Sequence, residues 1–416
     1  NKKGTKGLLS MDKFKIGFIG MGRRGDYWLH GCILAREDVD LRWICDIDSE
    51  KLEAASAKIA AKGFNPKATT DFHDILKDSE VEAVIISTDW ESHIPIAIEC
   101  MKAGMPVGLE VGGAYSVNDC FRLVHTWEET GTFFMMLENC CYGRTEMMLL
   151  NMARQNLFGD IVHCSGGYCH DLRNSLARGR ELKHYRLRNY LNRNCDTYPT
   201  HALIPIFKLL DINNGNRMVS LYSAASPAKG LMHYSKETGL GTDDVLPYGA
   251  MHGDVVTTII KCAHGETIHL NLETTLPRFY SRDLSVHGTK GIFTENGDSF
   301  YFDNIPEHHK SEAHKDFYGN IEDFYSEYDH PLWKKTLKEG VTGGHGGMDG
   351  LVLSAFSESV KNGWDSPVDV YDAASAMCIT ALSDESIATG MPVGIPDFTN
   401  GIWLCRKEKE KTLYSL

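Results

Sequence analysis

Beyond residue 136 the chain holds five short clusters of residues that exchange protons or bind hydroxyl groups. A Tyr hydroxyl and a His imidazole both give and take protons, whereas an Arg guanidinium donates hydrogen bonds. The clusters are Leu137-Glu138-Asn139, Gly166-Gly167-Tyr168-Cys169-His170-Asp171, Tyr185-Arg186, Tyr198-Pro199-Thr200-His201 and Pro277-Arg278-Phe279-Tyr280-Ser281-Arg282. Each cluster alone is more typical of a core or rim than of a site. Their chemistry therefore depends on whether the fold brings them together.

A second group of residues has the spacing of a nucleotide site. Gly20, Gly22 and Gly25 form a GxGxxG sequence that directly follows an apolar segment and opens a predicted helix. In that context the first glycine makes a tight turn, the second lets the backbone approach a pyrophosphate, and the third allows close packing of helix and strand. Asp46 ends the second predicted strand, where a carboxylate binds ribose hydroxyls and repels a 2′-phosphate. The pattern predicts NAD rather than NADP.

The elements that must position these residues alternate between strand and helix over residues 13–140. Ser116 is the predicted N-cap of the last helix in this part. The predicted strands are 13–20, 41–46, 81–88, 105–111 and 133–139, and helices are predicted at 49–61, 94–103 and 118–129. Continuous apolar strands in such an alternation predict a parallel sheet covered by helices on both faces.

After about residue 150 the pattern changes to longer, partly alternating strands, which predict an open and mostly antiparallel sheet. These strands are predicted at 161–170, 218–225, 254–262, 266–275 and 283–295. The remaining segments are predicted to be a loop over a site at 172–197, an excursion without a defined element at 303–347, and closing helices near 348–362 and 369–388.

The sequence therefore predicts an α/β protein of two domains, as its length of 416 residues also suggests. Residues 1–12 are predicted to be an N-terminal extension. Residues 13–145 are predicted to form an NAD-binding Rossmann domain with a doubly wound parallel sheet. Residues 146–416 are predicted to form a substrate-binding α+β domain with the open sheet.

Composition restricts the class of ligand. The formal net charge of -13 disfavours nucleic acid, because like charges repel a phosphate backbone. No apolar run approaches the eighteen or so residues that a membrane span needs. A small neutral molecule or a glycan is the expected partner, and a homo-oligomer is possible.

No metal is expected from the sequence. The twelve cysteines are scattered without zinc-ligand spacing, which favours buried free thiols. His308, His309 and His314 lie close together in the polar segment EHHKSEAHKD, which is more typical of a solvated surface than of a metal site.

Taken together, the glycine motif and the five clusters resemble glycoside hydrolase family 109, the NAD-dependent α-N-acetylgalactosaminidases within the glucose–fructose oxidoreductase superfamily. The resemblance extends from about residue 13 to residue 400. Its most specific segments are Met136-Leu137-Glu138-Asn139, GGYCHDLR at 166–173, YPTH at 198–201 and TTLPRFYSR at 274–282.

The resemblance implies a set of cofactor and substrate residues. Residues implied to line NAD, besides Gly20 and Gly22, are Arg24, Gly25, Asp46, Trp90, Glu91, Ser92, His93, Glu110, Val111, Asn139 and Tyr198. Residues implied to line the sugar are Tyr168, Arg186, Tyr198, Pro199, Thr200, His201 and Tyr280.

Two departures separate this chain from ordinary dehydrogenases of the superfamily. Those enzymes carry Glu-Lys-Pro at the end of the fifth strand, where this chain has Glu110-Val111-Gly112. They also tend to carry an Asp four residues before the helix histidine, where this chain has Thr197. Both differences favour the glycosidase branch. Within that branch Ala202-Leu203-Ile204 is bulkier than the expected glycines.

The function implied by the resemblance is that of a retaining exo-glycosidase acting on terminal α-N-acetylgalactosaminides. NAD-dependent glycosidases are an exception to the rule of two carboxylates. Oxidation at sugar carbon 3 acidifies the proton on carbon 2, which allows elimination, addition of water and return of the hydride. We expect His201 and Tyr198 to handle the hydroxyl proton at carbon 3 and Tyr168 to be the base at carbon 2. Glu138 is either a further acid or base or an ion-paired structural carboxylate.

Two other functions stay open at this stage. One is an NAD-dependent sugar or cyclitol dehydrogenase, which would release NADH during turnover. The other is a non-catalytic protein that binds NAD and a sugar, because a fold alone fixes no function. Relatives are often exported already folded, so a bacterial protein of the periplasm or cell surface is expected rather than a cytoplasmic one.

Overall fold

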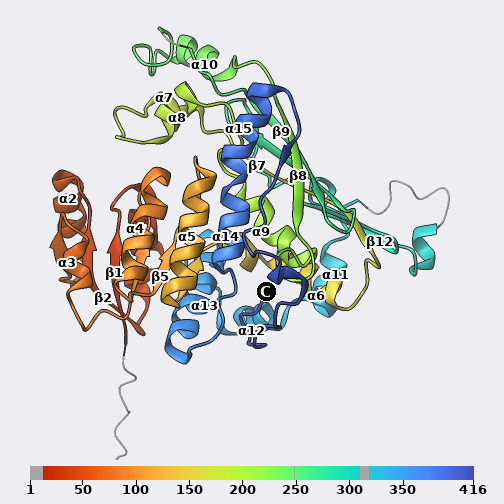
Figure 1. Ribbon diagram of the computed structural model, residues 1–416, viewed down its shortest axis with the longest axis horizontal. Coiled ribbons are helices and arrows are strands. Elements are labelled where there is room, and N and C mark those ends of the chain that lie inside the picture. The colour runs from red at the N-terminus through yellow and green to blue at the C-terminus, as the bar shows by residue number, and fades with distance from the viewer. Residues whose placement is uncertain (1–12, 248, 310–317) are drawn as a thin grey trace, which may run out of the picture.

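The computed structural model describes residues 13–247, 249–309 and 318–416. The extension predicted at residues 1–12 and the side chain of His314 lie outside the described residues. Two sheets organise the chain, and they lie side by side with long helices between them (Figure 1). This arrangement confirms the predicted fold class.

The first sheet has six parallel strands in the order β3-β2-β1-β4-β5-β6. Their bounds are β1 Phe14–Ile19, β2 Val39–Cys45, β3 Lys67–Thr69, β4 Ala83–Ile86, β5 Val107–Leu109 and β6 Phe134–Met136. Strands β4, β5 and β6 are buried throughout, as expected for strands covered on both faces. The short exposed edge strand β3 has no apolar pattern, and the sequence did not predict it.

Helices connect the strands of the first sheet, and polar side chains cap three of them. They are α1 Arg23–Gly31, α2 Ser49–Ala60, α3 His73–Leu76, α4 Trp90–Lys102 and α5 Val117–Thr130. The side chains of Asp48, Asp89 and Ser116 accept hydrogen bonds from backbone N–H groups in the first turns of α2, α4 and α5. The predicted N-cap of α5 is therefore confirmed.

The second sheet has eight strands in the order β13-β12-β11-β7-β10-β9-β8-β14. Their bounds are β7 Ile161–Cys169, β8 Met218–Ala225, β9 Val255–Cys262, β10 Thr267–Glu273, β11 Ser285–Gly288, β12 Gly291–Thr294, β13 Ser299–Phe302 and β14 Val393–Gly394. Only the pairing of β7 with β10 is parallel among these described strands. The long strand predicted at 283–295 is a hairpin, because the chain turns at Thr289 and Lys290.

Helices from the second half of the chain cover both sheets. Helices α9 (Thr200–Leu209) and α15 (Ile379–Thr389) pack against β7 and β8. Helices α13 (Met348–Asn362) and α14 (Val370–Met377) instead reach the first sheet, where the rings of Phe356 and Phe14 pack with centroids 5.9 Å apart. The remaining helices are α6 Arg144–Arg154, α7 Arg173–Ala177, α8 Arg186–Asn192, α10 Gly230–Thr238, α11 Glu322–Tyr328 and α12 Pro331–Glu339, with short 3-10 turns at Ile33–Ala35, Asn139–Tyr142, Glu295–Gly297, Pro306–His309, His345–Gly347 and Ile402–Leu404.

Several predicted segments differ from the structure. The loop predicted at 172–197 contains helices α7 and α8, and the excursion predicted at 303–347 contains α11 and α12. These short helices have few residues to show a period, which explains why the pattern missed them. The last predicted helix is two helices, α14 and α15, separated at Cys378. His308 is buried and its Nδ1 accepts a hydrogen bond from Phe302 N, so the prediction of a solvated surface is wrong for this residue.

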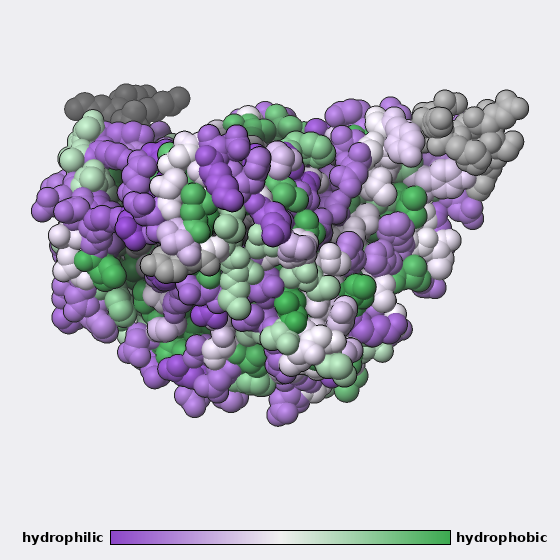
Figure 2. Space-filling model, turned by 90° about the horizontal axis from the view of Figure 1, so that it is seen from above, coloured by the Kyte–Doolittle hydropathy of each residue, from purple (hydrophilic) through white to green (hydrophobic). Residues whose placement is uncertain are grey.

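The thiols follow the prediction from composition. All twelve cysteines lie among the described residues and are free, and eleven of them are buried. Cys405 is the exposed one. None of the described helices combines the length and the apolar character that a membrane crossing requires. Viewed from above, polar side chains dominate the surface and apolar ones gather in small separate patches (Figure 2).

Candidate active site

The glycine turn after β1 shows which of its three glycines the protein itself requires. Gly20 has φ +105°, and a Cβ there would lie 2.5 Å from Ser87 O. A Cβ on Gly25 would lie 2.0 Å from Gly20 O, so this glycine allows helix α1 to pack against the turn. A Cβ on Gly22 would meet no protein atom within 4 Å. The open space beside Gly22 fits a bound ligand, as the dinucleotide motif requires.

Asp46 lies at the carboxyl end of β2, directly beside this turn. Its Oδ2 accepts a hydrogen bond of 2.6 Å from Met21 N, and its Oδ1 accepts one of 2.9 Å from Asp48 N. The carboxylate is therefore fixed next to the first turn of α1. A group in this place binds ribose hydroxyls and disfavours a 2′-phosphate.

The side chains of Arg24 and Glu110 pair with each other. Arg24 Nε donates to Glu110 Oε1 at 2.8 Å, and Trp28 Nε1 donates to the same oxygen at 2.8 Å. The other nitrogens of Arg24 reach Asp349 in helix α13. Both predicted cofactor residues thus direct their side chains into the protein. The N–H groups at the start of α1 supply the anion-binding end of the helix.

The segment Trp90 to His93 opens helix α4, and its four side chains point in different directions. Trp90 is buried, and its ring lies 5.4 Å from that of Tyr198. Glu91 is exposed and accepts from Arg188, so its side chain does not point toward the site. Ser92 Oγ bonds to Thr88 Oγ1 at 2.8 Å. His93 is buried, and the same burial lowers the pKa of its ring below the ordinary value.

The space that Trp90 occupies explains the departure after strand β5. A Cβ on Gly112 would lie 2.3 Å from Trp90 Cδ1. A proline in this position, as in Glu-Lys-Pro, would therefore collide with the indole. Val111 beside it is buried and directs its N–H to Glu110 Oε2. In this chain the indole of Trp90 therefore occupies the space that the proline of Glu-Lys-Pro would need.

Asn139 supplies a second test of whether a dinucleotide fits. It lies just beyond β6 and is buried, and its Nδ2 donates to Asp349 Oδ1 at 2.8 Å. This bond fixes the amide so that Oδ1, which is also buried, has no hydrogen-bond partner. A buried acceptor without a partner is costly unless a ligand donor satisfies it. Together with the space beside Gly22, this atom fits bound NAD.

The three residues predicted to be catalytic come together in one aromatic cluster. The ring of Tyr198 lies 4.5 Å from that of Tyr168 and 4.8 Å from that of His201. Tyr168 comes from strand β7, whereas the other two flank the start of α9. Tyr198 and His201 are three residues apart across the first helical turn, so their side chains share a face. Pro199 has φ -74° and fixes the backbone between them.

Glu138 holds the imidazole of His201. His201 Nδ1 lies 2.6 Å from Glu138 Oε1, and Cys140 N donates to the same oxygen at 3.0 Å. Burial opposes ionisation of this fully buried carboxyl, but contact with His201 brings the pKa of Glu138 below its ordinary value. A carboxylate here fixes the ring orientation and stabilises a positive charge on it, leaving Nε2 available for a proton.

Among the described residues, one group of potential metal-ligand atoms lies close enough together to hold an ion, and it includes Glu138 and His201. Atoms of Glu138, Cys140 and His201 lie within 4.8 Å of one another. The hydrogen bond between Glu138 and His201 already uses two of these donors. Burial raises the pKa of the Cys140 thiol well above its usual range, so the sulfur stays protonated. This chemistry favours the hydrogen bond over an ion.

Arg186 and Tyr280 complete the wall around the cluster. The Arg186 guanidinium lies 5.0 Å from the ring centre of Trp90 and 5.1 Å from that of Tyr198, and its buried Nε has no partner. Tyr280 is 47% exposed, and its ring lies 6.4 Å from that of Tyr168. Thr200 is buried with its hydroxyl unpartnered. A ligand with several hydroxyl groups could satisfy such unpartnered donors.

Sequence reasoning missed two residues of the site. His170 Nδ1 lies 3.1 Å from the Tyr168 hydroxyl, and burial, with the charge of Arg186, lowers the pKa of His170 so that its ring is neutral near pH 7. The signal was available, since His170 follows Tyr168 by two residues and shares its strand face. Asp349 contacts Arg24 and Asn139 from a distant part of the chain. The glycine-rich run 343–350 was its only local signal.

Comparison with known proteins agrees with this geometry. Residues 142–405 match the family described as the C-terminal domain of glycosyl hydrolase 109, and residues 14–138 match the oxidoreductase family with an NAD-binding Rossmann fold. The second match confirms the predicted cofactor, NAD. Similar solved structures include a myo-inositol 2-dehydrogenase from Lactobacillus plantarum (TM-score 0.66, 16% identity, 92% of this chain and 100% of that one) and apo scyllo-inositol dehydrogenase from Lactobacillus casei (TM-score 0.64, 13%, 93% and 99%). At such identities they show the fold alone.

Relatives of higher identity cover nearly the whole chain. The α-N-acetylgalactosaminidase of Tannerella forsythia is 37% identical over 94% of this chain and 88% of its own length. A glycosyl hydrolase family 109 protein of Parabacteroides distasonis is 35% identical over 95% and 89%. The glycine turn, the aromatic cluster and these matches agree, and this chain belongs to glycosyl hydrolase family 109.

Proposed function

We propose that the protein is a retaining exo-glycosidase that hydrolyses terminal α-N-acetylgalactosaminides by oxidation, elimination, addition of water and reduction. Family membership and the name of the Tannerella forsythia relative support this substrate. Bound NAD supplies hydride transfer at sugar carbon 3, which makes the reaction independent of two catalytic carboxylates. The glycine turn, Asp46 and the Asn139 amide would hold the cofactor.

The protein's own residues move the protons. His201, held by Glu138, takes the hydroxyl proton at sugar carbon 3, with Tyr198 beside it. Tyr168 gives its phenolic proton to His170, whose Nδ1 lies 3.1 Å from its hydroxyl, and takes the proton from carbon 2 in its place. Arg186 and Tyr280 bind the sugar hydroxyls and orient the ring.

One observation carries this assignment, the convergence of Tyr168, Tyr198 and the Glu138–His201 pair in one buried aromatic cluster. Tyr168 and His201, whose ring centres lie 5.7 Å apart, provide two separate proton-transfer groups, which suits a reaction that moves protons at two adjacent carbons. A simple alcohol oxidation needs only one such group.

The experiment is cleavage of a panel of p-nitrophenyl α- and β-glycosides, with the N-acetylgalactosaminide included. We expect the α-N-acetylgalactosaminide to be cleaved with retention, and in heavy water the released sugar should carry deuterium at carbon 2. Release of p-nitrophenol without that deuterium would contradict the elimination step. Addition of chelator should leave the rate unchanged.

A dehydrogenase of the same fold would give a different result with sugar substrates. It would accumulate free NADH when given sugars or cyclitols, with absorbance at the nicotinamide band rising in proportion to substrate consumed. The glycosidase returns its hydride and shows no such accumulation. The collision that Gly112 avoids with Trp90 leaves no room for the usual Glu-Lys-Pro, which favours the glycosidase.

We also propose a homo-oligomer formed through the face of the second sheet opposite α9 and α15. The paired residues Tyr222 and Ile259 and, farther along the sheet, the paired residues Ile292 and Tyr301 are large, exposed side chains on one face, in two neighbouring rows. Ile259→Lys should lower the mass measured by analytical ultracentrifugation. An unchanged mass would remove this face from the interface.

Export from a bacterial cytoplasm remains a prediction, for which cell fractionation is the test.

A further inference from the structure

Asp349 lies where four elements of the cofactor end meet. It stands in the first turn of α13 and is completely buried. Its oxygens accept from two nitrogens of Arg24 at 2.9 and 3.0 Å and from Asn139 Nδ2 at 2.8 Å. Arg24 in turn pairs with Glu110 at the end of β5. A residue 325 positions away from Arg24 thus ties together α1, β5, β6 and α13.

A glycine-rich loop brings Asp349 into this position. Gly343, Gly346 and Gly347 have φ between 66° and 99°, which side chains other than glycine rarely adopt. A Cβ on Gly344 would lie 2.6 Å from Asp349 Oδ2, so this glycine makes room for the carboxylate itself. His345 adds a fourth contact, with its Nδ1 2.8 Å from Asp349 Oδ2.

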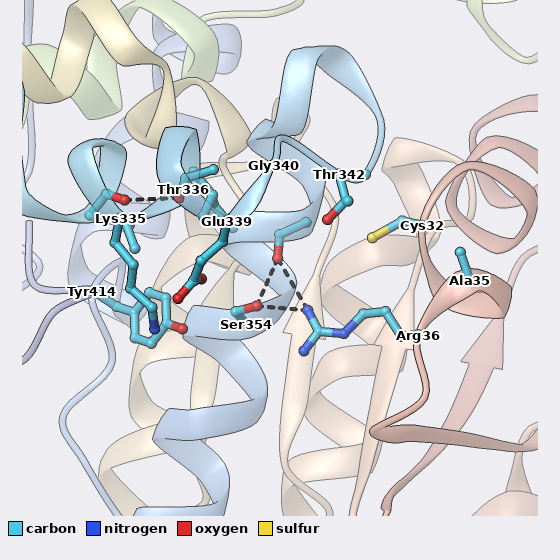
Figure 3. A pocket seen from close by; sticks show the side chains of 14 residues that line it. Cys32, Ala35, Arg36, Lys335, Thr336, Glu339, Gly340, Thr342, Ser354 and Tyr414 are labelled. Carbon is cyan, nitrogen blue, oxygen red and sulfur yellow. Dashed lines mark hydrogen bonds between the residues drawn. The ribbon is translucent and has the colours of Figure 1, made fainter.

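The opposite side of α13 is fixed as well. Arg36 donates from one nitrogen to Ser354 Oγ at 2.6 Å and to Gly350 O at 3.3 Å, beside a cavity of about 360 Å³ (Figure 3). None of the residues predicted to bind cofactor or sugar lines this cavity. The first two turns of α13 are therefore anchored to the α1 side of the molecule from two directions, by Arg24 and by Arg36.

We infer that Asp349 is a positioning residue for the cofactor, whose contacts with Arg24 and Asn139 slow the release of NAD. We call these three residues and Glu110 the Asp349 clasp. The clasp spans the carboxyl edge of the first sheet, where dinucleotides bind. It orients the Asn139 amide so that Oδ1 faces the ligand, and it holds the first turn of α1 against β5.

The function explains why such a clasp is useful. An enzyme that returns its hydride in every turnover gains from a cofactor that never leaves. This inference rests on the proposed function, but its test measures cofactor release without any glycoside. Asp349 is suited to the role, because hydrogen bonds from His345 and Arg24 outweigh burial and hold its pKa well below the ordinary range. The Asp349 carboxylate therefore stays ionised over the working pH range.

The test compares Asp349→Asn with Asp372→Asn. Asp372 is a matched control, since it is a buried aspartate in the first turn of α14 that accepts from Lys208 Nζ and Asn213 Nδ2. None of its partners belongs to the predicted cofactor or sugar residues. NAD release from each purified holoenzyme is followed after dilution into excess apo-dehydrogenase that traps free NAD, and melting temperatures are recorded in parallel.

We expect both variants to melt at lower temperature, but only Asp349→Asn to release NAD at least tenfold faster than the parent. Unchanged release from folded Asp349→Asn, or equally faster release from Asp372→Asn, would overturn the inference and leave a structural role. If Asp349→Asn does not fold, Arg24→Lys decides, because a lysine keeps the charge and cannot form the two-pronged pair. Severalfold faster release supports the clasp, and unchanged release overturns it.

Discussion

The two ends of the site are built in different ways. At the predicted cofactor end, the N–H groups that begin α1 and the open space beside Gly22 contribute more than side chains do, with Asp46 and Asn139 as the polar exceptions, and the charged side chains of Arg24 and Glu110 are paired with each other. At the sugar end the ligand-facing groups are side chains, namely the rings of Tyr168, Tyr198 and His201 with the Arg186 guanidinium beside them.

This difference has a consequence for what mutations do. A backbone site is damaged by added volume, whereas a side-chain site is damaged by lost functional groups. The cofactor end is therefore readable from a local motif, and the sugar end becomes visible only when separate segments come together. Substitutions that change function without changing stability, or the reverse, test this difference between the two ends.

The largest effect is expected at His201. His201→Ala should lower turnover by roughly a hundredfold or more, the scale of a lost acid–base group, with NAD content retained. Tyr198→Phe should lower it to a similar extent. Single-turnover cleavage is measured beside thermal melts. His252→Ala is the control, because this histidine is even more buried than His201 but stacks on Tyr190 outside the cluster. An unchanged rate in folded His201→Ala would refute the catalytic assignment.

A smaller loss is expected when the partner of His201 is neutralised. Glu138→Gln keeps the shape but removes the charge that stabilises a protonated imidazole, so turnover should fall about tenfold to a hundredfold. The pH profile of turnover should change shape as well. Glu146→Gln serves as the control, since Glu146 is a buried glutamate that pairs with Arg282. Equal losses in both variants would make Glu138 a structural carboxylate.

At the cofactor end, a methyl group added at Gly22 and one added at Gly25 should have different effects, although both glycines belong to one motif. Gly22→Ala meets no protein atom, so the apo-protein should keep its melting temperature while NAD affinity falls at least tenfold, or about 1.4 kcal/mol. Gly25→Ala collides with Gly20 O and should lower stability directly. Cofactor content after denaturation and melts of the apo-protein measure both. Normal NAD content in Gly22→Ala would mean that the ligand does not occupy this space.

The last effect concerns the pH dependence of stability, and it should leave turnover and cofactor binding unaltered. Burial raises the pKa of Asp196, whose Oδ1 accepts from Tyr198 N, to about 7. The protonated form is therefore favoured by folding, and this stability is lost as pH rises from the ordinary carboxyl range through about 7. Asp196→Asn should gain on the order of a few kcal/mol relative to the parent between pH 4 and pH 8, at about 1.4 kcal/mol per pKa unit.

Denaturant unfolding at the two pH values measures this gain. Asp397→Asn should show almost no pH dependence over this range, because the stability that Asp397 contributes is lost only as the pH falls below the ordinary carboxyl range. Burial raises the pKa of Asp397, but hydrogen bonds from Thr399 and Gly401 outweigh it and lower the pKa overall. A pH-independent difference for Asp196→Asn would contradict the buried, neutral carboxyl.

Sequence patterns predicted most of the fold, because its strands and long helices carry strong periodic signals. The order of residues 13–140 and the open second sheet both follow from those signals. Helices such as α7 and α11 are too short to show a period. The contact between Asp349 and Arg24 was beyond prediction, since nothing in either local sequence encodes a partner 325 positions away. Glu138 was recognised as a candidate, but its partner required the packing of α9.

The buried thiols give the folded chain a chemical signature. Cys405 is exposed, whereas the other eleven cysteines are buried and free. A thiol-specific reagent should therefore label the native protein once and the denatured protein twelve times. The rate at which the additional labels appear reports the opening of separate regions, since Cys45 lies in the first sheet and Cys262 in the second. The chain thus contains its own set of reporters for local unfolding.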